Sequence, residues 1–142
     1  CNSQKCQGDE ICIANQDLII ALDASGSVRQ EGFNILREFA VNLTLRYKSK
    51  YYGSMAAARL GMVLFGNGQL KTLDDGTTSI SEAKEVSALT DDFVALRTEA
   101  NKQEWQKGFT NMAQALSLAE VLLQQGGRPD AQSAILVLSD GK

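Results

Sequence analysis

The stretch Leu18-Ile19-Ile20-Ala21-Leu22-Asp23-Ala24-Ser25-Gly26-Ser27 is an unbroken apolar run that ends in three oxygen-bearing side chains. An apolar run of this length, closed by a polar turn with a glycine, predicts a strand buried on both faces of a parallel sheet. Since alternate residues of an extended chain point the same way, Asp23, Ser25 and Ser27 can direct their oxygens at a common point. One carboxylate and two hydroxyls suit a hard divalent cation, Mg²⁺ before Ca²⁺, better than zinc or copper.

A second buried strand, over residues 134–138, is also followed by an aspartate, Asp140. Two parallel strands that each end in an acid place both carboxylates along one edge of the sheet, where open α/β sheets bind ligands. The simpler alternative for Asp140 is an Asx turn within its own loop. Between the two strands, Thr110 precedes a helix, and residue physics alone favours helix capping for its hydroxyl and offers the same role for Ser27.

The remaining elements follow from apolar spacing and turn signals. After Ser27, an amphipathic helix is predicted to face the sheet, and a second helix follows Thr110. Residues 59–65 predict another buried strand, and Asn67-Gly68 predicts a hairpin to an antiparallel edge strand over 69–73. Short helices are expected over 80–89 and 93–100. The residues expected on the inner side of the two long helices are Phe33, Leu36, Phe39, Ala40, Leu43 and Tyr47 in the first and Met112, Leu116, Ala119 and Leu123 in the second. Trp105 and Phe109 are expected to be core or helix-staple residues.

The five residues 23–27 resemble the Asp-x-Ser-x-Ser signature of von Willebrand factor type A domains, called I domains in integrins. In that family the signature forms part of a metal-ion-dependent adhesion site (MIDAS). The family also uses a threonine from a glycine-containing loop and the aspartate of a Ser-Asp-Gly or Thr-Asp-Gly triplet, which Thr110 and Ser139-Asp140-Gly141 match. The resemblance therefore implies a metal site made of Asp23, Ser25, Ser27, Thr110 and Asp140.

The same resemblance, over about residues 17–141, implies an α/β, Rossmann-like fold. We expect a mostly parallel central sheet with one antiparallel edge strand and helices on both faces. A cysteine-containing leader is expected over residues 1–14 and the type A domain over 15–142. That domain is expected to be partial, because the last strands and helices of the family's sheet have no counterpart before residue 142.

Composition limits the compartment and the classes of partner. A net charge of −3 without a basic cluster argues against nucleic acid, and no apolar run is long enough to span a membrane. Cys1, Cys6 and Cys12 all precede the first strand, which favours an oxidising compartment and leaves one cysteine without an internal partner. Together with the glycosylation sequon at Asn42, they predict an extracellular, secreted or cell-surface protein.

The function implied by the resemblance is that of a binding module and not of an enzyme. Mg²⁺, with Mn²⁺ or Ca²⁺ as alternatives, would keep one open coordination position for an acidic side chain of a matrix or cell-surface protein. Two aspartates roughly neutralise the ion, and neutral hydroxyl ligands leave it electrophilic enough to accept another anion.

Two rival interpretations stay open at the level of sequence. A haloacid-dehalogenase-like phosphatase also places an aspartate after a buried strand and binds Mg²⁺, but Ser25 stands where such enzymes carry their second acid. A type A scaffold with an idle metal site is the other alternative. Serine hydrolases are disfavoured because the chain contains no histidine, and P-loop nucleotidases because it contains no Gly-Lys-Ser/Thr loop.

Overall fold

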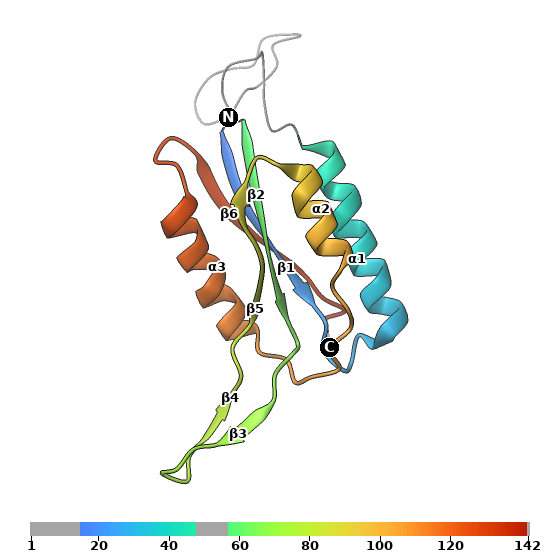
Figure 1. Cartoon of the computed structure of the whole chain (residues 1–142), viewed down its shortest axis with the longest axis vertical. Coiled ribbons are helices and arrows are strands. Elements are labelled where there is room, and N and C mark those ends of the chain that lie inside the picture. The colour runs from blue at the N-terminus through green and yellow to red at the C-terminus, as the bar shows by residue number, and fades with distance from the viewer. Residues whose placement is uncertain (1–14, 48–56, 142) are drawn as a thin grey trace.

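The computed structural model describes residues 15–47 and 57–141, so the predicted cysteine leader lies outside the described residues. Figure 1 shows a central sheet with helices packed on both of its faces. The elements in chain order are β1 (Gln16–Asp23), α1 (Arg29–Arg46), β2 (Ala58–Phe65), β3 (Leu70–Thr72), β4 (Thr78–Ile80), β5 (Lys84–Thr90), α2 (Phe93–Asn101), α3 (Met112–Gly126) and β6 (Gln132–Leu138). None of the described helices has the length and apolar character needed to cross a membrane.

The main sheet has the strand order β5-β2-β1-β6. Both neighbours of β1 run parallel to it, and β5 pairs antiparallel with β2 at one edge. The fold is thus the mostly parallel, Rossmann-like α/β arrangement with one antiparallel edge strand that the sequence predicts. Since β1 and β6 are parallel neighbours, their carboxyl ends meet at the same edge of the sheet.

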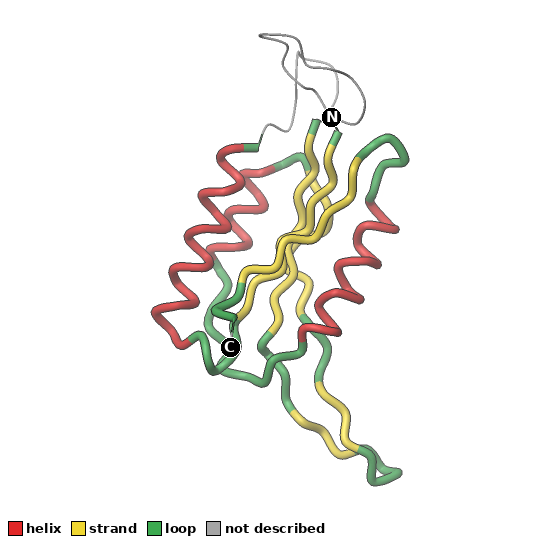
Figure 2. Tube along the Cα trace, turned by 180° about the vertical axis from the view of Figure 1, so that it is seen from behind, coloured by secondary structure: helices red, strands yellow, loops and turns green. Residues whose placement is uncertain are grey.

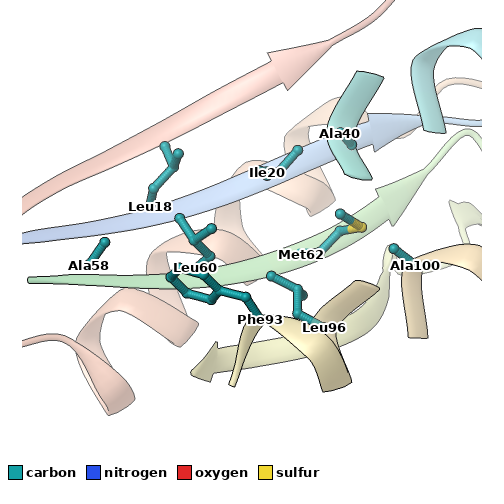
Figure 3. Close-up of a cluster of buried hydrophobic side chains, with 9 residues drawn as sticks. All are labelled: Leu18, Ile20, Ala40, Ala58, Leu60, Met62, Phe93, Leu96 and Ala100. Carbon is teal, nitrogen blue, oxygen red and sulfur yellow. The ribbon is translucent and has the colours of Figure 1, made fainter. Parts of the chain in front are cut away.

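Strand β1 is buried on both faces, as its unbroken apolar run predicts. Leu18 and Ile20 face α1 and α2, where they pack with Leu60, Met62, Phe93 and Leu96 (Figure 3). Ile19 and Ala21 face α3 and pack with Ala115, Ala119 and Leu122. Figure 2 shows the resulting three layers, with α1 and α2 on one side of the sheet and α3 on the other. The alternation of side chains therefore assigns each helix to its face.

The predicted hairpin between residues 59–65 and 69–73 is wrong. β3 pairs with β4 in a separate two-stranded ribbon that projects away from the main sheet (Figure 1). The antiparallel partner of β2 is β5, so the predicted helix over 80–89 is wrong as well. Pairing with β2 places Val86 and Leu89 against the cores on opposite faces of the sheet, and this burial overrides the helical preference of the Glu-Ala-Lys-Glu segment. The helix predicted over 93–100 is confirmed as α2.

The helix faces differ from the prediction at particular positions. In α1, Phe33 and Ala40 are buried as expected, but Phe39 is 52% exposed. In α3, the inner face is formed by Ala115, Ala119 and Leu122, while Met112 and Leu116 are exposed. Of the predicted α3 face, Ala119 is buried and Leu123 packs against the core as expected, whereas Ala115 and Leu122 are buried in place of Met112 and Leu116.

Candidate functional site

Asp23 lies at the carboxyl end of β1 and is 1% exposed. Its Oδ1 accepts a hydrogen bond of 2.8 Å from the Ser25 backbone N–H, and its Oδ2 accepts one of 2.7 Å from the Ser139 hydroxyl. Within residues 15–47 and 57–141, no cationic side chain forms an ion pair with this carboxylate. A buried carboxylate held only by neutral donors favours a cation nearby, because burying an unpaired charge is costly.

Ser25 and Ser27 bring two hydroxyl groups together beside Asp23. Their Oγ atoms lie 3.1 Å apart, and Ser25 is buried while Ser27 is exposed. The alternative role of Ser27 as helix cap is wrong, since α1 has Val28 at its N-cap and no capping side chain. The Ser27 hydroxyl is therefore directed at Ser25 and not at the first turn of the helix.

Three loops are joined by backbone hydrogen bonds behind these hydroxyls. Gly26 N–H donates to Gly108 O over 3.0 Å, and Gly108 N–H donates to Gly66 O over 2.8 Å. A Cβ on Gly66, which has φ +81°, would lie 2.1 Å from Ser25 N, and one on Gly108 would lie 2.6 Å from the Asn67 carbonyl carbon. Only glycine permits this approach. The glycine-rich turn after β2 thus serves the close contact of three loops, which explains why it does not form the predicted hairpin.

Thr110 is exposed in the loop before α3. The capping role that residue physics favours for it is wrong, because the N-cap of α3 is Asn111 and no side chain caps this helix. Asn111 is buried and instead ties the loop to its neighbours. It accepts a 2.7 Å bond from Gly66 N–H and donates to Ser81 O over 2.8 Å and to Asn67 Oδ1 over 3.0 Å. The hydroxyl of Thr110 is therefore available to a ligand, on a loop held in place by its neighbour.

A cleft of about 650 Å³ opens over these loops. Its lining residues are Ser25, Gly26, Ser27, Gly68, Gln69, Leu70, Gln106, Lys107, Gly108, Phe109 and Thr110. Three of the predicted site residues, Ser25, Ser27 and Thr110, thus share one cleft. Asp23 and Asp140 do not line it. Asp23 is buried directly beneath Ser25, and Asp140 is exposed next to Ser139, the residue that contacts Asp23.

Three features of the loop before Thr110 differ from, or add to, what the sequence predicts. The Trp105 indole N–H donates to Ser25 O over 2.8 Å, so the expected core role of this half-buried ring is correct but includes a direct link to the site. Phe109, by contrast, is 60% exposed and was wrongly expected in the core. Lys107 has φ +55°, and its N–H donates to Ala24 O over 3.0 Å. Backbone strain of this kind concentrates at functional sites.

The donor set fits a hard divalent cation. Within the described part of the chain, no group of three or more histidine, cysteine, aspartate or glutamate side chains could hold a metal. A metal at this edge would therefore depend on the serine and threonine hydroxyls together with the two aspartates. Hydroxyl and carboxylate oxygens are the ligands that Mg²⁺ and Mn²⁺ accept, whereas structural zinc sites are built from cysteine and histidine.

The sequence motif identified the side chains around the cleft but not the groups that position them. The sequence does not predict the contact of Ser139 with Asp23, the bond between Asn111 and Gly66, or the close approach of Gly66 to Ser25. One signal was available: Gly66-Asn67-Gly68 follows a buried strand parallel to β1, and so lies at the same edge as Asp23. Because open α/β sheets bind ligands at the carboxyl edge of their strands, a glycine-rich turn at that edge can belong to a binding site and need not form a hairpin.

Comparison with known proteins gives a family model and several similar folds. The model of the von Willebrand factor type A domain matches residues 17–142. Proximal thread matrix protein 1 from the mussel byssus, in a structure with a zinc-occupied MIDAS motif, is 19% identical with a TM-score of 0.69, covering 92% of this chain and 32% of that chain. The vWF domain of the type V pili tip protein Mfa5 from Porphyromonas gingivalis is 15% identical with a TM-score of 0.64, covering 92% and 39% of the two chains.

A third structure, the pilus adhesin RrgA from Streptococcus pneumoniae, is 20% identical with a TM-score of 0.58, covering 87% of this chain and 20% of that chain. At such identities the structural likeness shows the fold alone. The chain spans about a third of the length of the mussel protein, at 32%. No curated protein matches the chain.

Proposed function

The chain belongs to the von Willebrand factor type A domain family, and from that premise we propose that it is a metal-ion-dependent protein-binding module. In this proposal Asp23, Ser25, Ser27, Thr110 and Asp140 hold the ion, which is Mg²⁺ first, with Mn²⁺ or Ca²⁺ as alternatives. The bound ion supplies an open position for an aspartate or glutamate of a partner protein. The partner is a matrix or cell-surface protein, and the module acts outside the cell in adhesion.

The observation that carries the proposal is the pairing of a buried acid with a cluster of hydroxyls. Asp23 is 1% exposed and accepts only neutral donors from the described residues, and one of these donors is the backbone N–H of Ser25, which lines a cleft together with Ser27 and Thr110. The two serine hydroxyls, 3.1 Å apart, have no capping role that would compete. A cation beside them would compensate the charge of Asp23, and its charge would in turn attract an acid from the cleft side.

Adhesion outside the cell is supported by the kinds of protein that share the fold. The mussel protein is a thread matrix protein with a zinc-occupied MIDAS motif, RrgA is a pilus adhesin, and Mfa5 is a pilus tip protein. Their identities to this chain are 20% or lower, so ligand and compartment are carried over only as part of the proposal.

Calorimetric titration of the full chain with MgCl₂, MnCl₂, CaCl₂ and ZnCl₂ tests the metal site. We expect saturable binding of Mg²⁺ or Mn²⁺ that Asp23→Asn and Thr110→Val each weaken by about tenfold or more, which corresponds to about 1.4 kcal/mol per tenfold. Asp74→Asn and Thr72→Val change the same residue types at exposed positions in and beside the β3–β4 ribbon and should leave the affinity unchanged. Equal affinities in all four variants would exclude the proposed ligand set.

The role of the metal in partner binding needs a separate measurement. EDTA should abolish partner capture while the circular dichroism spectrum of the chain stays the same, because the fold rests on its apolar clusters and not on the metal. Capture that persists in EDTA would contradict the proposed mechanism. A preference for Zn²⁺ over Mg²⁺ in the titration would keep the site and change the ion.

A further inference from the structure

The cleft has apolar walls beside the proposed metal site. Leu70, at the start of the β3–β4 ribbon, is 61% exposed, and Phe109, next to Thr110, is 60% exposed. Both line the same cleft as Ser25, Ser27 and Thr110. A ligand that reaches the hydroxyls therefore passes a leucine and a phenylalanine that come from different segments.

The backbone holds these two apolar side chains in place without burying them. Gly68 N–H donates to Phe109 O over 3.0 Å, and Phe109 N–H donates to Gly68 O over 2.8 Å. This pair of bonds anchors Phe109 directly to the segment that leads into β3 and Leu70. Since both backbones are fixed, a partner that covers the two side chains has little ordering to impose on them. Exposed aromatic residues on a fixed backbone are the type that dominates binding energy at protein interfaces.

The charge of the cleft favours an acidic group in the ligand, beside the apolar group that Leu70 and Phe109 favour. Of the described residues that line it, Lys107 is the only charged one, and none is acidic. Lys107 Nζ lies 6.0 Å from the centroid of the Trp105 ring, which keeps the cation near the loop that precedes Thr110. A cationic group in a cleft without acids favours an anionic segment, in contrast to the net charge of −3 of the whole chain.

We propose that the cleft selects a partner segment in which a large apolar side chain neighbours the metal-binding acid, and that Leu70 and Phe109 contact this apolar side chain. The proposal rests on the proposed metal-dependent function and adds the class of ligand to it. Leu70 and Phe109 are then specificity-determining residues, and the β3–β4 ribbon contributes one wall of the binding surface.

A phage-displayed library of random linear hexapeptides, selected on the full chain in Mg²⁺ and in EDTA, separates the two parts. In Mg²⁺ we expect enrichment of aspartate or glutamate together with a large apolar residue at a constant offset. Peptides selected on Leu70→Ser or Phe109→Ser should still contain the acid but no longer a preferred apolar residue. Each variant should also bind the peptide selected on the unmodified chain about tenfold more weakly. Ile35→Ser and Val94→Ser, each at a position 67% exposed on α1 or α2, are the matched controls and should behave like the unmodified chain.

The outcomes distinguish the two proposals. Enrichment of the acid without any apolar preference, or an apolar preference that both cleft variants keep, overturns the specificity proposal and leaves the metal-dependent function standing. If the selected peptides are the same in Mg²⁺ and in EDTA, or if they show no enrichment of aspartate or glutamate, the proposed function is overturned and the specificity proposal with it. Because both replaced side chains are mostly exposed, an unchanged thermal midpoint is expected for each variant and verifies that the variants fold.

Discussion

Two buried aspartates lie at opposite ends of β1, and only one of them has a counter-charge among the described residues. At the amino end, Asp17 is 0% exposed and forms an ion pair of 2.9 Å with Arg128, which also donates its Nε over 3.1 Å and its backbone N–H over 2.7 Å. At the carboxyl end, Asp23 is equally buried, but its partners in the described chain are one backbone N–H and the Ser139 hydroxyl.

The difference separates an end of the sheet that an ion pair closes from an end that, in our proposal, binds a cation. The Asp17 carboxylate has its counter-charge within the protein, so it locks the loop after α3 onto β1 and has no need of a ligand. The Asp23 carboxylate faces the edge where open α/β sheets bind ligands and has hydroxyls as neighbours in place of a guanidinium. The same residue type on the same strand thus serves stability at one end and, in our proposal, cation binding at the other.

The largest expected effect comes from removing the counter-charge of Asp17. Arg128→Met leaves a fully buried carboxylate without its cation, and we expect the free energy of unfolding to fall by about 3 to 5 kcal/mol in a urea titration. Arg46→Met, at an exposed position in the last turn of α1, should cost far less.

The double variant Asp17→Asn/Arg128→Met sharpens this test. Since it removes both charges, it should recover most of the lost stability, because the penalty lies in the uncompensated charge and not in the missing contact. A double variant as unstable as Arg128→Met would mean that Arg128 acts through its packing and its backbone contacts alone.

The second effect in size concerns Asp23 and depends on metal. At a Mg²⁺ concentration about a hundred times the dissociation constant, binding should add about 2.7 kcal/mol to the free energy of unfolding. Asp23→Asn should abolish this increment in urea titrations that compare Mg²⁺ with EDTA. The Asp17→Asn/Arg128→Met variant should keep it, because its changes lie at the other end of the strand. If Asp23→Asn still shows the Mg²⁺-dependent gain in the free energy of unfolding, then Asp23 does not bind the metal and does not differ from Asp17 in the way proposed.

The sequence predicted well those parts of the fold that local pattern controls. The apolar runs of β1, β2 and β6 and the helices α1, α2 and α3 are recognisable from spacing alone. Residues 80–89 were not, because their helical preference is overridden by pairing with β2, a contact that no local pattern encodes. The inner face of α3 differs in part for a related reason: Ala119 is buried as predicted, but Ala115 is buried while Met112 and Leu116 are exposed, and a search for large apolar residues overlooks a small one.

The candidate site divides along the same line. The side chains of Asp23, Ser25 and Ser27 form one short motif, the strand pattern brought Asp140 to the same edge, and the family resemblance selected Thr110. The role of all five as ligands stays a prediction. The contacts of Ser139, Asn111 and Gly66 join segments far apart in the sequence, so only the folded chain reveals them. Local pattern can therefore indicate which groups are candidates for a site, but not which groups hold them in position.

A smaller effect is expected at Ser139, the only side chain in the described residues that donates a hydrogen bond to Asp23. Ser139→Ala removes a hydrogen bond to a charged group, which is worth about 1.5 kcal/mol at the lower end of the usual range. The lower end applies because Ser139 is half-buried and water can reach its position. Urea titrations in EDTA measure the loss, and Ser133→Ala, at an exposed position of β6, is the control. A cost as large as that of Arg128→Met would mean that Asp23 depends on its own neighbours as strongly as Asp17 does.

The smallest effect belongs to a third aspartate, Asp75, which is fully exposed in the turn between β3 and β4. The Thr77 hydroxyl donates to its Oδ1 over 2.6 Å and the Thr77 backbone N–H over 2.9 Å, and these bonds, the hydroxyl first, lower the pKa of Asp75. A lowered pKa means that the ionised carboxylate stabilises the turn fully above the ordinary pKa of aspartate, and that this contribution is lost as the pH falls through the lowered value.

Thr77→Val should therefore raise the pKa of Asp75 in an NMR titration of its carboxyl carbon, whereas Thr78→Val on the adjacent residue should not. A pKa that stays low in Thr77→Val would assign the shift to the Thr77 backbone N–H and not to its hydroxyl.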